Sequence, residues 1–203
     1  MFFVNEDIHK KYGMNKILLS IAAVLVICFT ACAQKKDKQN VSNASSKMLV
    51  AYFSATGTTA QVARNIADIT GGELFEIAPQ HPYTEADLDW NDRQSRSSVE
   101  MNDVKSRPAL KVTKTDIAGY DVVFIGYPIW WNLAPRIINT FIESHDLRGK
   151  TVIPFATSGG SDISNSVSEL KKAYPDLNWK EGKLLNKVGN SALQNWIHGI
   201  TNH

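Results

Sequence analysis

From residue 48 onward, short apolar runs alternate with amphipathic stretches, and few folds accommodate such an alternation. The runs Met48–Phe53, Val122–Tyr127 and Thr151–Ala156 predict strands that are buried on both faces. Strands that alternate with helices form a parallel sheet with right-handed crossovers and helices on both faces. The amphipathic stretches predict helices at Thr58–Thr70, Pro135–Ser144, Ser164–Tyr174 and Ser191–Ile200.

Two weaker runs, Glu73–Ile77 and Lys183–Asn186, raise the number of predicted strands to five. The sequence therefore predicts an α/β domain with a doubly wound parallel sheet. Ala78–Tyr120 is far longer than an ordinary connection. We expect its part Asp87–Asp103 to be partly helix and partly ordered loop, because Trp90 and Val99 are poor choices for a disordered linker.

The loop after the first strand is rich in small and hydroxyl residues and opens onto a helix. It consists of Ser54, Ala55, Thr56, Gly57, Thr58 and Thr59. Backbone amides, hydroxyls and the helix dipole in such a loop favour a phosphate group. The chain lacks GxxxxGK[ST] and GxGxxG patterns here, which argues against nucleoside triphosphates and dinucleotides. The alternative is that the hydroxyls only cap the helix, but one cap explains one hydroxyl.

Two further loops follow the third and fourth strands. In an open α/β sheet, ligands bind beyond the carboxyl ends of the strands, so these loops are expected to share one site. The paired tryptophans have core or interface packing as their alternative explanation. Two glycines in the other loop permit a close approach of backbone to a flat ligand. The candidate residues are Pro128, Ile129, Trp130, Trp131 and Asn132 in the first loop and Thr157, Ser158, Gly159 and Gly160 in the second.

The stretch Ser54–Thr59 resembles the [ST]-x-T-G-x-T phosphate loop of flavodoxins at every specified position. The resemblance spans about residues 47–200. Within the family, the chain resembles a bacterial flavodoxin-like group whose second connection carries a DLDW…SRS stretch, here Asp87–Trp90 and Ser95–Ser97. It implies strand order 2-1-3-4-5, FMN as the cofactor and Trp130 or Trp131 stacked on the flavin ring. Many flavodoxins carry a tyrosine in the loop after strand four, and this chain has none there. Either that ring face stays open, or Trp90 or Tyr83 covers it.

The resemblance implies electron transfer, with redox proteins or a small acceptor such as a quinone as partners. Two alternatives stay open: an FMN-dependent NAD(P)H:quinone or small-molecule oxidoreductase, and an envelope binding module without cofactor. From Lys47 onward, 16 basic and 17 acidic side chains leave the domain nearly neutral, which offers no footprint for nucleic acid.

The N-terminus is typical of a secretory signal rather than of a fold element. Lysines precede an apolar run, Ile17–Thr30, that is shorter than the roughly 20 residues of a membrane span. The stretch Phe29–Cys32 resembles the lipobox of bacterial lipoproteins. We therefore predict a signal peptide at 1–31, a lipidated Cys32 and flexible linker at 32–46, and a flavodoxin-like domain at 47–203. This arrangement would anchor the domain to the cell envelope outside the cytoplasm; an uncleaved anchor is the alternative.

Other reactive groups suggest little chemistry. The histidines at 81, 145 and 198 have no metal-ligand spacing, so no metal site is predicted. Arg93 and Arg96 are expected to be solvated charges, with an anionic substrate or partner as the alternative. For the acidic residues at 87, 89 and 92 we expect capping or solvation rather than a cation.

Overall fold

The computed structural model describes residues 46–114, 116–186 and 189–201. The predicted signal peptide, Cys32 and nearly all of the predicted linker lie outside these residues. Within the described part of the chain, no helix has the length and apolar character needed to cross a bilayer.

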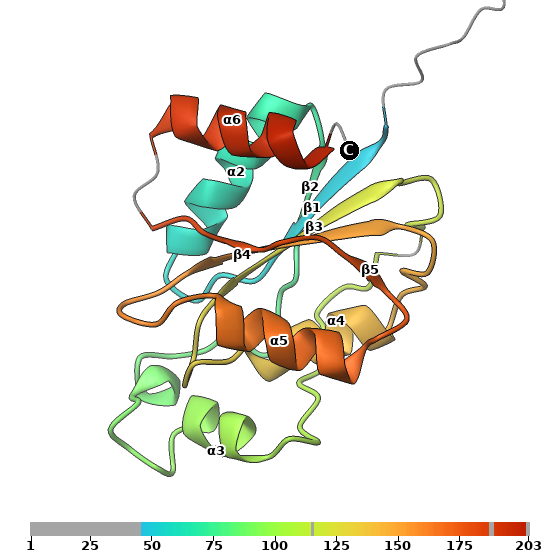
Figure 1. The fold of residues 1–203 in the computed structure, drawn as a ribbon. Coiled ribbons are helices and arrows are strands. Elements are labelled where there is room, and N and C mark those ends of the chain that lie inside the picture. The colour runs from blue at the N-terminus through green and yellow to red at the C-terminus, as the bar shows by residue number, and fades with distance from the viewer. Residues whose placement is uncertain (1–45, 115, 187–188, 202–203) are drawn as a thin grey trace, which may run out of the picture. The chain divides into compact units, whose positions relative to one another are not determined.

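The centre of the domain is a parallel sheet with the order β2-β1-β3-β4-β5, which confirms the expected fold (Figure 1). A short strand, β6, also pairs with β4. The β3 and β4 strands are almost entirely buried. The strands are β1 Met48–Tyr52, β2 Glu73–Glu76, β3 Val122–Pro128, β4 Thr151–Thr157, β5 Asn178–Trp179 and β6 Lys183–Leu184.

The fifth strand differs from its prediction because it is divided into β5 and β6. Val152 and Ala156 accept hydrogen bonds from the backbone amides of Lys180 and Leu185, on the edge side of β4. The backbone hydrogen-bonding groups of successive residues point to opposite sides of a strand, so those of Pro154 face the same edge as those of Val152 and Ala156. Proline has no amide N–H to donate there. The pairing is therefore interrupted opposite Pro154. Gly182 fills the interruption, where an added Cβ would lie 3.0 Å from the Pro154 ring.

Helices cover both faces of the sheet (Figure 1). One buried cluster joins the sheet to Ala63 and Ile66 of α2 and to Leu193 of α6. The cluster on the other face includes Phe141 of α4 and Val167 of α5. The helices are α2 Thr58–Thr70, α4 Arg136–Glu143, α5 Ser164–Ala173 and α6 Asn190–Thr201, close to their predicted bounds.

Within the long connection between β2 and β3, the stretch Asp87–Asp103 is part helix and part loop, as expected. The connection contains the 3-10 helix η1 (Ala86–Leu88) and the helix α3 (Arg96–Asn102), which lie below α4 and α5 in Figure 1. Arg107 forms two hydrogen bonds with the Glu143 carboxylate of α4, at 2.7 and 2.8 Å. Arg136 of α4 donates a hydrogen bond to the Met101 carbonyl oxygen. These contacts attach the connection to the helical layer.

Candidate functional site

The loop after β1, residues 54–59, is called the β1 loop, and it leads into an uncapped helix N-terminus. The Ser54 hydroxyl accepts a hydrogen bond from the Gly57 amide at 3.1 Å, which closes the loop. Gly57 is the N-cap of α2 with φ of 89° and provides no side-chain cap. The first amides of α2 have no partner within the helix, since such partners would lie before its start. Thr56 and Thr58 are exposed, with hydroxyls 3.4 Å apart. Amides, hydroxyls and helix dipole together suit an anion.

Thr59 occupies a different environment from the other threonines of the loop. Its hydroxyl is buried and lies 2.8 Å from the Thr157 hydroxyl at the end of β4. Both predicted site residues therefore use their side chains to join α2 to β4. The Thr157 carbonyl oxygen also accepts a hydrogen bond from the Ile129 amide at 2.8 Å. The three loops are thus linked at one edge of the sheet.

The β3 loop forms a tight turn. The amides of Trp130 and Leu133 each donate to the carbonyl oxygen of the other, at 3.0 and 2.9 Å. Trp131 and Asn132 between them have φ of 46° and 63°. Two central residues with positive φ are typical of a type I′ turn, which favours asparagine and glycine. Asn165 on α5 donates to the Asn132 carbonyl oxygen at 3.0 Å and holds the turn in place.

The β4 loop is held by Asn186, a residue that the sequence predicted only as the end of a strand. Its side chain accepts from the Ser158 amide at 2.7 Å and donates to the Ser158 carbonyl oxygen at 2.6 Å. The Ser158 hydroxyl accepts from the amides of Gly160 and Ser161. Gly159 and Gly160 are exposed, and an added Cβ on either would meet no atom within 4 Å. Protein packing therefore does not require these glycines.

A cavity of about 440 Å³ opens between the β1 loop, the β3 loop and the long connection. Its volume lies within the range of small-molecule sites, about 300–1,000 Å³. None of the described residues that line it is charged, and the β4 loop residues 157–160 lie outside it. The lining residues are Ala55, Thr56, Leu88, Trp90, Ser97, Pro128, Ile129, Trp130 and Trp131. Leu88 and Ser97 were not predicted as site residues, although both belong to the DLDW…SRS stretch that carries the family resemblance.

Behind the cavity, the ring of Trp130 is fixed by aromatic neighbours. The Phe53 and Tyr83 rings meet it edge to face, with centroids 5.4 and 5.3 Å away. The Arg96 guanidinium lies 4.1 Å from the centroid of the Tyr83 ring. Arg96 also binds Glu100 at 2.6 Å and donates to the His81 carbonyl oxygen. The expectation that Arg96 is a solvated charge was wrong, because sequence spacing does not reveal these tertiary contacts.

Charges near the cavity are satisfied locally. The Tyr83 hydroxyl donates a hydrogen bond to Glu100. Burial is the main cause that raises the pKa of Tyr83, and the hydrogen bond to Glu100 is the second. Hydrogen bonds from the Thr84 amide and hydroxyl lower the pKa of Asp87. Asp89 and Asp92 accept hydrogen bonds from the amides of residues 91 and 94. The three aspartates therefore bind nearby backbone amides in local turns, and the side-chain cap of α3 is Ser95 instead.

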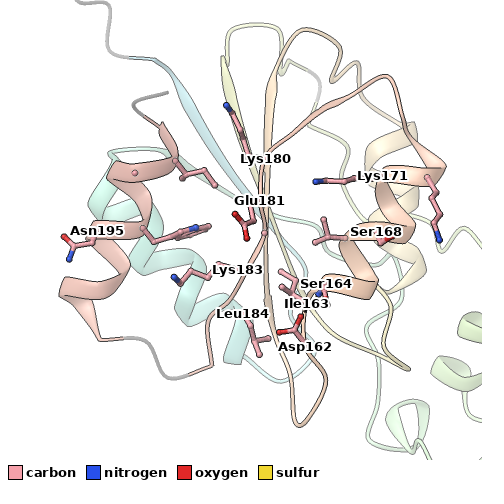
Figure 2. A pocket seen from close by; sticks show the side chains of 16 residues that line it. Asp162, Ile163, Ser164, Ser168, Lys171, Lys180, Glu181, Lys183, Leu184 and Asn195 are labelled. Carbon is pink, nitrogen blue, oxygen red and sulfur yellow. Dashed lines mark hydrogen bonds between the residues drawn. The ribbon is translucent and has the colours of Figure 1, made fainter.

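A larger groove, about 1150 Å³, lies at the β5 and β6 edge of the sheet, between α5 and α6. Figure 2 shows residues 180–184 running along its floor, with Lys171 on the α5 side and Asn195 on the α6 side. It contains no residue of the β1 or β3 loops. Lysines and an interrupted strand are features that protect a sheet edge from unwanted pairing. The smaller cavity, and not this groove, is therefore the candidate cofactor site.

The comparisons with known proteins agree with this architecture. The flavodoxin family model matches residues 47–200, and the chain belongs to this family. A protein from Bacteroides eggerthii, provisionally described as a flavoprotein, is 67% identical with a TM-score of 0.75, over 76% of this chain and 98% of that one. A similar protein from Bacteroides uniformis is 60% identical with a TM-score of 0.73, over 75% and 97% of the two chains.

A more distant relative is known with its cofactor. The flavoprotein from Lactobacillus acidophilus, solved in complex with FMN, is 25% identical with a TM-score of 0.59. The match covers 75% of this chain and 99% of that one. No curated protein matches the chain.

Proposed function

We propose that this chain binds FMN at the carboxyl edge of its sheet and carries electrons between protein partners outside the cytoplasm. The observation that carries the proposal is that the loop before α2 and a group of tryptophans line the same cavity. An uncapped helix N-terminus with exposed hydroxyls lies on one side, and tryptophans lie on the other. The first suits a phosphate and the second suits a flat aromatic ring.

The residues present fit both ends of FMN. Gly57 has open space around the position of a Cβ, so a phosphate can approach the α2 amides without a clash. Ser54 closes the loop, which leaves the hydroxyls of Thr56 and Thr58 to donate to phosphate oxygens. The loop contains no basic residue, so hydrogen bonds and the helix dipole would replace a countercharge.

The β3 loop would hold the ring. Trp130 is fixed by Phe53 and Tyr83, so its ring is ordered before the cofactor arrives. Trp131 and Asn132 present their backbone at the tip of the turn, where it can exchange hydrogen bonds with the edge of a ring. When bound, FMN supplies reversible electron and proton uptake, and the protein sets the access and potential of the flavin.

An absorbance spectrum of the purified chain tests the cofactor directly. We expect a yellow protein, or a colourless one that becomes yellow when FMN is added. FMN should bind more tightly than riboflavin, because riboflavin lacks the phosphate. Equal affinity for the two would contradict the phosphate site. A protein that takes up neither would favour the binding module without cofactor.

The enzymatic alternative, NAD(P)H:quinone or small-molecule oxidoreductase, is favoured by the apolar cavity rim that the long connection provides. It predicts NAD(P)H oxidation by the isolated protein when a quinone is the acceptor. A carrier would show little such turnover and would instead exchange electrons with a reduced protein partner.

Tethering to the cell envelope rests on the sequence of residues 1–46. We propose cleavage before Cys32 and attachment of lipid to its sulfur. Cells grown with labelled palmitate should label the wild-type protein and leave Cys32→Ser unlabelled. Label on Cys32→Ser, or wild-type protein confined to the cytoplasm, would contradict the tether.

A further inference from the structure

One face of the proposed ring site has no aromatic residue from the expected loop. Thr157, Ser158, Gly159 and Gly160 of the β4 loop do not line the cavity, and none of them has a side chain that can stack on a ring. The long connection contributes Leu88, Trp90 and Ser97 to the lining of the cavity, together with residues of the β1 and β3 loops.

Trp90 lines this cavity with most of its indole in water. Its exposed fraction is 72%, the highest among the exposed large hydrophobic residues of the described chain. The backbone around it is nevertheless ordered. The Asp89 carboxylate accepts from the Asn91 amide at 2.9 Å, and the Asp92 amide donates to the Asp89 carbonyl oxygen at 3.2 Å. An ordered, exposed indole beside an apolar cavity is arranged to meet a ligand.

Tyr83, the other aromatic residue of this connection, is already engaged. Its ring packs edge to face on Trp130 behind the cavity, and the Arg96 guanidinium covers it at 4.1 Å. Its hydroxyl donates to Glu100. Tyr83 does not line the cavity, so it supports Trp130, whereas Trp90 is free to contact a ring.

We propose that Trp90 stacks on the face of the FMN ring that the β3 loop leaves uncovered. This inference rests on the proposed function and adds a binding residue to the same site. A ring held between two aromatic walls is accessible mainly at its edge. Planar substrates then cannot stack on it, whereas electrons can still pass at the exposed edge. The arrangement therefore fits an electron carrier better than a hydride-transfer enzyme.

The test compares full-length Trp90→Ala and Trp90→Phe with the wild type, by titrating FMN and following the quenching of its fluorescence. Trp90→Ala is expected to raise the Kd about five- to a hundredfold, the range found when an aromatic platform is removed from a stacked base. Trp90→Phe keeps an aromatic face and should stay within about fivefold of the wild type. The circular dichroism of the bound flavin should change in Trp90→Ala, because that band reports the surroundings of the ring.

Val99→Ala is the matched control. Val99 belongs to the same connection and is 53% exposed, but it does not line the cavity. Its variant should bind FMN like the wild type, and both alanine variants should unfold at the wild-type temperature. Wild-type affinity in Trp90→Ala, or equal weakening in Trp90→Phe, would overturn the inference while FMN binding stands. Failure of the wild type to bind FMN would instead overturn the proposed function.

Discussion

The β1 and β3 loops both follow buried strands at the same edge of the sheet, but they obtain positive φ angles in different ways. The β1 loop uses Gly57, which adopts φ of 89° without a steric penalty. The β3 loop instead places Trp131 and Asn132 in the left-handed region. Asparagine tolerates this conformation, but it is unusual for a residue as bulky as tryptophan. The β1 loop offers backbone amides together with two small hydroxyl side chains, whereas the β3 loop keeps large side chains at the expense of strain.

The largest expected effect is on the β1 loop. The double variant Thr56→Val with Thr58→Val should weaken FMN binding by about 3–6 kcal/mol, because each hydrogen bond to a charged group contributes about 1.5–3 kcal/mol. Isothermal titration would measure it. Thr140→Val is the control, since the buried Thr140 hydroxyl has no hydrogen-bond partner among the residues that the structure describes. An unchanged affinity in the double variant would mean that backbone amides alone hold the phosphate.

Gly126 and Gly57 are required for different reasons, the first for lack of space and the second for its positive φ. A Cβ on Gly126 of β3 would lie 2.1 Å from the buried Phe155 ring, so Gly126→Ala should destabilise the fold by about 1–3 kcal/mol. A Cβ on Gly57 meets nothing, so Gly57→Ala suffers only from its positive φ, at about 1–2 kcal/mol. Urea unfolding measures both variants. Gly126→Ala should lose stability without FMN, whereas Gly57→Ala should also lose FMN affinity.

The strain in the β3 turn is the subject of the third prediction. Asn132→Val should lower the free energy of unfolding by about 1–2 kcal/mol, because a β-branched residue is poorly suited to φ of 63°. Asn132→Gly should change it by less than about 1 kcal/mol, since glycine adopts this conformation freely. Chemical denaturation of the protein without FMN would check both. Equal stability of the two variants would show that the turn is not strained.

The smallest effect concerns pH. Hydrogen bonds from Arg107, and then from Tyr174, lower the pKa of Glu143. A lowered folded-state pKa gives stability that is present above the unfolded value, about 4.3, and is lost as pH falls through the folded value. The side chains of Arg107 and Glu143 are 34% and 42% exposed, so we expect less than about 1 kcal/mol.

Urea unfolding between pH 3 and 6 would measure this effect. Arg107→Gln should make the dependence shallower. Lys172→Gln, which removes the exposed pair with Glu169 on α5, is the control. Identical pH profiles for Arg107→Gln and the wild type would show that the contact between the long connection and α4 contributes nothing.

The strands and helices were predictable where a local pattern determines them. The bounds of α2 follow from its apolar spacing and from Gly57 and Gly71, the two left-handed residues that flank it. The division of the fifth strand was missed, although Pro154 was visible in the sequence. Its effect depends on which neighbour its missing amide faces, and only the assembled sheet shows this.

The site was predictable only where a local sequence pattern determines it. The phosphate loop is contiguous, so its residue types and order are sufficient to propose an anion site. The contacts of Arg96 and Asn186 join segments far apart in the chain. Arg96 lies against Tyr83, and Asn186 holds Ser158, 28 residues away. Neither contact leaves a pattern that can be seen without the fold.

The amino-acid sequence by itself determined the alternating architecture, the phosphate loop and the presence of tryptophans after the third strand. These features depend on local periodicity and on the conformations open to neighbouring residues. Only the tertiary structure decided that Trp90 borders the cavity while Tyr83 lies behind Trp130. Which of two aromatic side chains reaches a cavity depends on how a long connection packs on the sheet, and that packing is a sum of contacts between distant residues.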